Sequence, residues 1–305
     1  MPKFRPHLPQ PAPQLSAGDN VVSVVSGGRN RSYLLHLPLN EPSGPAPLVI
    51  FLHGGGGTAL SAVQSTQLSE KADAAGFAVV YPEGTRPDPE APAQLPGNPQ
   101  FWNDGSNHGP SNWTAVDDTT FIADMIDDIG RRYPIDPARI YAAGFSNGGA
   151  MALRLGVELS ARLAAVAAVA GHLWLPEPAV SRPVPLIYFA GTDDPVVPID
   201  GGTGQLPWSL PYSVPPVRHT IERWAALSGL GLVPVWDHSQ PGYSRAIYGE
   251  ESARTRIDVY VIAGMGHNWP GGRRLLPKRI VGEKSDALRA NDVMWRFFSK
   301  FHCPP

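Results

Sequence analysis

Cysteine is nearly absent from this chain of 305 residues. Its one cysteine, Cys303, is followed only by two prolines, so no disulfide can form within the chain. We expect Cys303 to be a free thiol without a chemical role. The fold must therefore rely on a hydrophobic core, and a chain of this length can bury a large one.

Long apolar runs are missing as well. Nowhere are about 18 consecutive residues apolar, so the sequence predicts no membrane-spanning helix. Residues 1–20 are rich in proline and contain no apolar stretch of the kind that marks a secretory signal peptide. We expect this leader to be poorly ordered and residues 21–305 to form a single domain. On the sequence alone the chain is predicted to be soluble and cytoplasmic, with no membrane partner.

Neither sign of charge is in excess, because the formal net charge is -2 at pH 7. Such a weak overall charge creates no field that would attract nucleic acid or an anionic lipid surface. The expected partner is therefore a small or neutral molecule, and nucleic acid is not expected to bind. The sequence leaves the oligomeric state open, and a monomer is assumed.

Short apolar segments alternate with longer amphipathic ones along most of the chain. The runs 21–25 and 33–37 flank a turn-like Gly-Gly-Arg-Asn cluster and predict an antiparallel hairpin, and the continuously apolar run 47–52 predicts a strand buried on both faces. Further strands are expected at 78–81, 140–143, 163–170, 186–190 and 257–263, and helices at 59–75, 118–133, 147–159, 216–227 and 285–301. This alternation predicts an α/β fold with a mostly parallel, eight-stranded sheet and helices on both faces.

Two segments interrupt the alternation. Residues 82–112 are rich in proline, glycine and asparagine and are too long for an ordinary connection. Trp102 lies inside this segment and Trp113 follows it, and both indoles are costly to leave in water. The segment is therefore either a decorated surface loop or a part of the functional site. The second irregular segment, residues 200–215, also carries aromatic side chains.

Residues 144–148, Gly-Phe-Ser-Asn-Gly, fit the pattern G-x-S-x-G. The pattern alone is weak, but in this chain it follows an apolar strand and opens a helix, which is the strand-turn-helix that a nucleophile elbow requires. The glycines are needed because the turn is too tight for side chains two residues either side of the serine. Ser146 is therefore the candidate nucleophile of an α/β-hydrolase fold.

A serine hydroxyl is a weak nucleophile, so it needs a base, and the base needs a carboxylate to orient it. In this fold the carboxylate and then the histidine follow the ends of later strands. Asp193 and Asp194 come just after the strand 186–190, and His267 follows the strand 257–263 in a glycine-rich loop. His267 is the candidate base, and spacing alone leaves both aspartates as candidates for its partner.

Acyl transfer also needs hydrogen-bond donors for the oxyanion that forms on the substrate. Residues 53–57, His-Gly-Gly-Gly-Gly, follow the buried strand 47–52 and fit the glycine-rich loop that supplies one backbone N–H in this fold. We predict the N–H of Gly55 and that of Asn147, directly after the nucleophile, as the oxyanion hole. His53 itself is expected to be structural.

Two further groups of residues have simpler explanations than a functional site. Five aspartates lie between residues 117 and 128, yet Asp117 and Asp118 suit a helix N-terminus and the others suit a solvated helix face. No metal site is therefore predicted. His172 and Trp174 follow the strand 163–170 at the edge of the sheet where the predicted catalytic residues lie, so they either line a substrate pocket or pack inside the fold.

Together these motifs resemble the polyhydroxybutyrate-depolymerase-like and feruloyl-esterase-like branch of the α/β hydrolases. The matching blocks extend from about residue 47 to the C-terminus: Leu-His-Gly-Gly-Gly-Gly at 52–57, Val-Asp-Asp at 116–118, Gly-Phe-Ser-Asn-Gly-Gly at 144–149, Gly-Thr-Asp-Asp-Pro-Val-Val-Pro at 191–198 and Gly-His-Asn-Trp-Pro-Gly at 266–271. The family pattern Gly-Thr-x-Asp-Pro-Val-Val implies Asp194 as the catalytic carboxylate.

The resemblance also implies that Trp269, the aromatic residue after the histidine, lies at the rim of the active site. Trp113, Trp174 and His172 are further candidates for substrate contacts. The chain departs from the family in having Asn268 where relatives often carry threonine, and it lacks the cysteines that staple many secreted members. Secretion, which the family implies if a signal was removed, and attack on polymers therefore do not follow from the resemblance alone.

The sequence thus predicts one catalytic domain that hydrolyses carboxylic esters through an acyl-enzyme and needs no cofactor. The expected substrates are small or polymeric esters, either short-chain hydroxyalkanoate or hydroxycinnamoyl. Three alternatives use the same fold: a serine peptidase, which would need polar groups that hold a peptide terminus, an acyltransferase, which would admit an alcohol in place of water, and a non-catalytic binding protein, which would usually lack one member of the triad.

Overall fold

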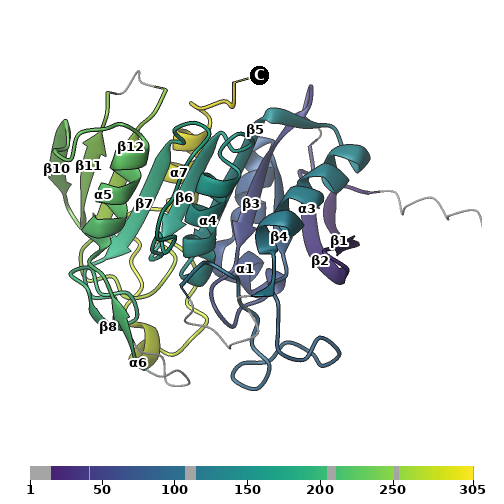
Figure 1. Ribbon diagram of the computed structural model, residues 1–305, viewed down its shortest axis with the longest axis horizontal. Coiled ribbons are helices and arrows are strands. Elements are labelled where there is room, and N and C mark those ends of the chain that lie inside the picture. Colours follow the sequence, from purple (N-terminus) through teal and green to yellow (C-terminus); the bar gives the residue numbers. More distant parts are fainter. Residues whose placement is uncertain (1–14, 41, 107–114, 205–210, 251–253, 305) are drawn as a thin grey trace, which may run out of the picture.

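The computed structural model of the chain describes residues 15–40, 42–106, 115–204, 211–250 and 254–304. Within them, ten strands form one sheet in the order β1-β2-β4-β3-β5-β6-β7-β12-β11-β10 (Figure 1). The strands of this sheet are β1 (Gly18–Ser26), β2 (Arg29–Leu37), β3 (Ala46–Leu52), β4 (Ala78–Pro82), β5 (Ile135–Phe145), β6 (Ala165–Val169), β7 (Leu186–Gly191), β10 (Trp236–Gln240), β11 (Tyr243–Tyr248) and β12 (Ile257–Ile262). A separate hairpin joins β8 (Gly202–Gly204) to β9 (Tyr212–Val214).

The middle of the sheet is parallel and its two ends are antiparallel. Strands β4, β3, β5, β6, β7 and β12 run parallel to one another, whereas β1, β2, β11 and β10 are paired antiparallel to their neighbours. All eight strands predicted from the sequence are present, so the mostly parallel sheet is confirmed. The predicted number of eight is wrong, because the hairpin of β10 and β11 extends the sheet by two strands beyond β12.

Seven helices accompany the sheet in the part of the chain that the structure describes. Their bounds are α1 (Ala59–Thr66), α2 (Leu68–Ala75), α3 (Asp118–Arg132), α4 (Asn147–Glu158), α5 (Val217–Leu227), α6 (Lys278–Val281) and α7 (Ala290–Phe298). The buried side chains of α3, α4 and α5 belong to one hydrophobic cluster, and those of α1, α2 and α7 belong to another. Figure 1 shows α4 and α5 in front of the sheet and α7 behind it. The prediction of helices on both faces is therefore confirmed.

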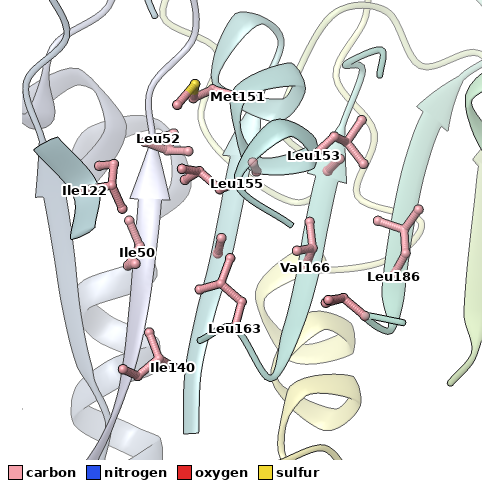
Figure 2. Close-up of a cluster of buried hydrophobic side chains, with 14 of the residues drawn as sticks. Ile50, Leu52, Ile122, Ile140, Met151, Leu153, Leu155, Leu163, Val166 and Leu186 are labelled. Atoms are coloured by element: carbon pink, nitrogen blue, oxygen red, sulfur yellow. The ribbon is translucent and has the colours of Figure 1, made fainter. Parts of the chain in front are cut away.

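Strand β3 shows why the sheet has two cores. All seven of its residues are buried, and alternate side chains point to opposite faces of a strand. Leu48, Ile50 and Leu52 accordingly join the cluster beneath α3 and α4, while Val49 and Phe51 join the cluster beneath α1 and α7. Figure 2 shows part of the first cluster, in which side chains of α4 lie over those of β3, β6 and β7.

Two predicted helices differ from the observed ones. The helix expected at 59–75 is split at Gln67, whose backbone is left-handed at φ 56°, and the hydroxyl of Thr66 accepts a hydrogen bond from the N–H of Leu68 at 3.2 Å. The helix expected at 285–301 begins only at Ala290. Its predicted first turn is replaced by a pairing in which Gly271 donates its N–H to the carbonyl oxygen of Ser285 at 2.9 Å.

The carboxyl ends of the parallel strands meet at one edge of the molecule, which is the bottom of Figure 1. The long segment after β4, the hairpin of β8 and β9, and helix α6 all extend from this edge. Ligands of open α/β sheets bind outside these strand ends. Among the described residues, no helix has both the length and the apolar character needed to cross a membrane.

Candidate active site

Ser146 occupies a strained turn between β5 and α4. Its φ of 58° and ψ of -122° lie outside the usual regions for a residue with a side chain, and its N–H donates to the carbonyl oxygen of Val169 at 2.8 Å. The turn is possible because the flanking positions are glycines. A Cβ added at Gly144 would lie 2.0 Å from the carbonyl oxygen of Gly148. The predicted strand-turn-helix at Ser146, which is the geometry of a nucleophile elbow, is therefore present.

The structure brings together the three side chains that chain order and the resemblance predict. The Oγ of Ser146 lies 2.9 Å from Nε2 of His267, and Nδ1 of His267 lies 2.8 Å from Oδ2 of Asp194. His267 and Asp194 are only 6% and 5% exposed. Because a carboxylate only accepts hydrogen bonds, Nδ1 of the histidine carries the proton and Nε2 accepts from the serine hydroxyl. This is the arrangement that activates a serine.

The structure also distinguishes the two adjacent aspartates. The second carboxylate oxygen of Asp194 accepts the backbone N–H groups of Val196 and Val197, each at 2.8 Å, so the side chain is fixed on both sides. Asp193 instead is exposed and accepts a hydrogen bond from the hydroxyl of Thr192. Its position fits a turn residue, and only Asp194 contacts His267.

The loop that carries His267 is held by the segment around α6. The N–H of His267 donates to the carbonyl oxygen of Val281 at 2.6 Å, and that of Gly266 donates to the carbonyl oxygen of Glu283 at 2.8 Å. The side-chain amide of Asn268 donates to the same carbonyl of Glu283 at 2.9 Å. Asn268 thus helps to anchor the histidine loop.

The glycine-rich loop after β3 lies beside the elbow. A Cβ added at Gly54 would lie 3.4 Å from the Cβ of Ser146, so this loop and the serine are in direct proximity. His53 is 2% exposed; its Nε2 accepts the N–H of Gly84 at 3.0 Å and its Nδ1 donates to the carbonyl oxygen of Gly54 at 2.8 Å. Both ring nitrogens are used within the fold, in agreement with the structural role predicted for His53.

Stability should depend on pH through His53, because burial lowers its pKa from 6.5 to about 4. Between these values the unfolded chain binds more protons than the folded one, so the free energy of unfolding falls as the pH decreases from 6.5 towards 4. The full loss amounts to roughly 3 kcal/mol. Urea unfolding at pH 7 and pH 4.5 should show a smaller decrease in His53→Gln than in the wild type. His219→Gln, which changes an exposed histidine, should retain the wild-type decrease, and equal decreases in all three proteins would contradict the assignment.

A cavity of about 700 Å³ is lined by Ser146 and His267. Its walls combine the elbow and the glycine-rich loop with residues of the long segment after β4, which are Leu95, Pro96, Pro99, Phe101, Trp102, Asn103, Asp104 and Ser106. The described part of this segment therefore lines the cavity and is more than surface decoration. Both Phe145 and His267 line the cavity, and their rings lie 4.6 Å apart.

The four predicted substrate contacts have different outcomes. Trp174 and His172 line the cavity, and their rings meet edge to face at 5.2 Å. Trp269 also lines it but is only 4% exposed, because its ring packs against Phe51 at 5.0 Å and its Nε1 donates to Asn291. It is thus a buried wall and not the flat rim surface that the resemblance implied. Trp113 lies outside the described residues.

His172 also has a structural contact. It is 2% exposed, and its Nδ1 lies 3.1 Å from the hydroxyl of Thr220 in α5. Tyr212, in the second irregular segment, lines the cavity as well. Burial raises the pKa of Tyr212 to about 12, so its hydroxyl stays protonated at neutral pH and can donate a hydrogen bond.

The aspartates between residues 117 and 128 bind other side chains. Asp117 caps α3, and Asp118 forms a buried ion pair with Arg31 at 2.8 Å. The prediction of a solvated face is wrong for Asp128, which is 6% exposed and accepts a hydrogen bond from the hydroxyl of Tyr33 at 2.6 Å. Within the described residues no group of three or more histidine, cysteine, aspartate or glutamate side chains could hold a metal ion.

Residues 40–205, more than half of the chain, match the phospholipase/carboxylesterase family. The chain belongs to the phospholipase/carboxylesterase family. It is 29% identical over 310 residues to NocK of Nocardia uniformis subsp. tsuyamanensis, which is named as an esterase, and this match covers 92% of the chain and 83% of NocK.

Other relatives of the chain are named for the particular esters that they hydrolyse. The chain is 31% identical to feruloyl esterase B of Piromyces equi, with 73% of this chain and 39% of that protein covered. It is 25% identical to poly(3-hydroxyalkanoate) depolymerase C of Paucimonas lemoignei, with 79% and 59% covered. The chain thus spans less than two thirds of either relative.

A solved structure shows the same fold. Acetyl xylan esterase from Aspergillus awamori superimposes with a TM-score of 0.59 at 16% identity, covering 82% of this chain and 94% of that one. Together with the family match, this structure confirms the predicted α/β-hydrolase fold. The family match and the esterase relatives confirm the prediction that the chain is an ester hydrolase.

Sequence reasoning misses the contacts that surround the triad. The sequence marks Trp102 only as an indole that is costly to expose, and it proves to be 2% exposed directly behind the glycine-rich loop. Its presence in a loop rich in proline and glycine is the available signal. The backbone N–H groups that donate to Asp194 could not be found from the sequence, because no particular side chain marks such a donor.

Proposed function

We propose that this chain hydrolyses carboxylic esters through an acyl-enzyme formed on Ser146, with His267 as the base and Asp194 as its orienting carboxylate. The observation that carries the proposal is the continuous chain of hydrogen bonds from serine to histidine to aspartate at 2.9 and 2.8 Å. The strained elbow and the cavity supply the two other requirements, a nucleophile that faces the cavity and space for a substrate.

The first half of the reaction follows from these contacts. His267 takes the proton of the Ser146 hydroxyl through Nε2 as the oxygen attacks the ester carbonyl carbon. The imidazolium that forms is stabilised by the adjacent carboxylate of Asp194. The same proton is then given to the alcohol oxygen as the ester bond breaks, which leaves the acyl group on the serine.

The second half repeats these steps with water. Nε2 of His267 takes a proton from a water molecule, whose oxygen attacks the acyl carbon, and the proton returns to Ser146 as the acid leaves. In both halves a negative charge develops on the carbonyl oxygen. We propose the backbone N–H groups of Gly55 and Asn147 as its donors, because the loop of the first lies against the elbow and the second directly follows the nucleophile.

The cavity walls favour an acyl group that is apolar or aromatic. Phe101, Phe145, Trp174 and Tyr212 line the same cavity as Ser146. Flat rings stack favourably on such side chains. We propose hydroxycinnamoyl esters, such as the feruloyl esters for which four relatives are named, as the first substrate class, and esters of short hydroxyalkanoates, small or at the end of a polymer, as the second.

Removal of the Trp174 ring tests this substrate class. Trp174→Ala should lower kcat/KM for methyl ferulate about fivefold more than kcat/KM for 4-nitrophenyl acetate, because an acetyl group has no ring that could stack on the indole and a stacking contact contributes about 1 kcal/mol. The measurement is steady-state hydrolysis of both esters by the same preparation. Trp236→Ala, which removes a 40% exposed indole from the distant edge strand β10, should change both values equally. If Trp174→Ala also lowers both equally, the ring does not contact the acyl group.

A further inference from the structure

Trp102 contacts both segments that carry the proposed oxyanion donors, one through its indole and the other through its backbone. Its Nε1 donates to the carbonyl oxygen of His53 at 2.9 Å. Its backbone N–H donates to Oδ1 of Asn147 at 2.8 Å, and its carbonyl oxygen accepts from Nδ2 of Asn147 at 3.0 Å. One residue, 2% exposed, thus contacts both the glycine-rich loop and the residue after the nucleophile.

On the first side, these contacts fix the course of the glycine-rich loop. The carbonyl that accepts the indole N–H belongs to His53, two residues before Gly55. The imidazole ring of His53 and the indole of Trp102 lie 5.0 Å apart. The preceding residue of the same segment, Phe101, packs its ring so closely on the glycines that a Cβ added at Gly55 would lie 2.4 Å from it. The loop therefore has no room to shift towards residues 101 and 102.

On the second side, the amide of Asn147 has both of its N–H donors in use. One donates to the carbonyl oxygen of Trp102 and the other to Oδ2 of Asp104 at 2.8 Å. The backbone of Asn147, whose N–H is the second proposed donor, begins α4. Three hydrogen bonds through one short side chain leave this residue little freedom to rotate.

The segment that carries Trp102 is itself anchored in the core of the fold. The N–H of Asn103 donates to Oδ2 of Asp118 at 2.8 Å, and the other oxygen of Asp118 binds Arg31 in an ion pair whose side chains are 6% and 1% exposed. From α4, Arg154 donates to the carbonyl oxygen of Asn103 at 2.7 Å. The segment of Trp102 is therefore hydrogen-bonded to α3 and α4, and Asp118 of α3 is in turn paired with Arg31 of β2. These contacts restrict the movement of Trp102.

From these contacts we propose that Trp102 is a positioning residue that holds both donors of the oxyanion hole at the separation that the tetrahedral intermediate requires. The inference rests on the proposed function. Donors contribute most to a rate when they are fixed in place before the charge develops. Loss of the indole N–H should consequently weaken binding of the transition state more than binding of the substrate.

The test compares the same substitution, tryptophan to phenylalanine, at two buried positions of the full-length chain. Trp102→Phe removes an indole N–H that donates to a backbone carbonyl, and Trp224→Phe removes another, which donates to Val184 at 2.9 Å beneath α5 and is 1% exposed. With 4-nitrophenyl acetate, Trp102→Phe should lower kcat about 10-fold to 100-fold with KM within about twofold, since loss of a whole donor costs about 100-fold to 1,000-fold. Trp224→Phe should leave kcat within about twofold even if it lowers stability as much.

A second readout and a second variant complete the test. A trifluoromethyl ketone, which adds to Ser146 to give a tetrahedral oxyanion, should bind Trp102→Phe weaker by the same factor as the loss in kcat. Asn147→Ala keeps the backbone N–H but removes the amide, and it should reproduce the loss in kcat even if Trp102→Phe does not fold. Wild-type kcat in both variants would overturn the inference. If the wild-type protein hydrolyses no ester, or if Ser146→Ala still hydrolyses one, the proposed function would instead be rejected.

Discussion

Replacing Ser146 by alanine is expected to lower kcat for 4-nitrophenyl acetate by about 10⁴-fold to 10⁶-fold. The hydroxyl is the group that would form the bond to the acyl carbon, and neither of its neighbours in the triad can replace it. Its one hydrogen-bond partner among the described side chains is His267, so its removal leaves the core untouched. The free energy of unfolding should therefore stay within about 0.5 kcal/mol of the wild type.

Two measurements check this result. Steady-state hydrolysis gives the rate, and labelling with a fluorophosphonate, which reacts only with an activated serine, should be lost together with it. Ser299→Ala, at the end of α7 and far from the cavity, provides the matched control and should keep both activities. Retention of hydrolysis by Ser146→Ala would show that the reaction takes place elsewhere.

A single added methyl group at Gly148 is expected to have the second largest effect. In Gly148→Ala the new Cβ would lie 2.2 Å from the carbonyl oxygen of Leu52 and 2.4 Å from that of His53, so it meets backbone at the end of β3. Backbone atoms of a buried strand cannot move aside as a flexible side chain can. We expect α4 to be displaced from β3, with a loss of stability of about 3 kcal/mol and a loss of most esterase activity.

The control is the same substitution in another helix. Gly130 lies inside α3, where the nearest atom to an added Cβ is a methyl group of Ile135 at 3.8 Å. Gly130→Ala should raise the free energy of unfolding by about 0.5 to 1 kcal/mol, because alanine favours the helix and restricts the unfolded chain. Urea unfolding measures the stability of both variants, and ester hydrolysis measures their activity. An active and stable Gly148→Ala would mean that the elbow is less tightly packed than the distances indicate.

The parts of the site that sequence reasoning can place are those with a local physical signal. Ser146 is predictable because its turn leaves no room for side chains two residues before and after it. Both positions must be glycine, so the turn is recognisable as a pattern of five consecutive residues. His267 is predictable because a parallel sheet sends the ends of successive strands to one edge, so chain order predicts position. The choice between Asp193 and Asp194 comes from the resemblance, and the structure explains it by the two N–H groups that fix Asp194.

The parts that cannot be placed depend on contacts between distant segments. Strand β10 has five exposed residues and no apolar pattern, so nothing in it marks a strand until β11 pairs with it. The break at Gln67 is marked by neither glycine nor proline. The place of Trp102 depends on Asn147, 45 residues further along the chain. In each case the partner that determines the structure lies outside any window of local sequence.

The wide separation of the triad along the chain has a consequence for biosynthesis. Ser146 and His267 are 121 residues apart, and the histidine follows the last strand to be made. A serine hydroxyl without its base is nearly unreactive. If the proposed triad is the catalytic one, the elbow can thus form and stay inert while the ribosome is still producing the chain, and reactivity follows only when β12 pairs with β7.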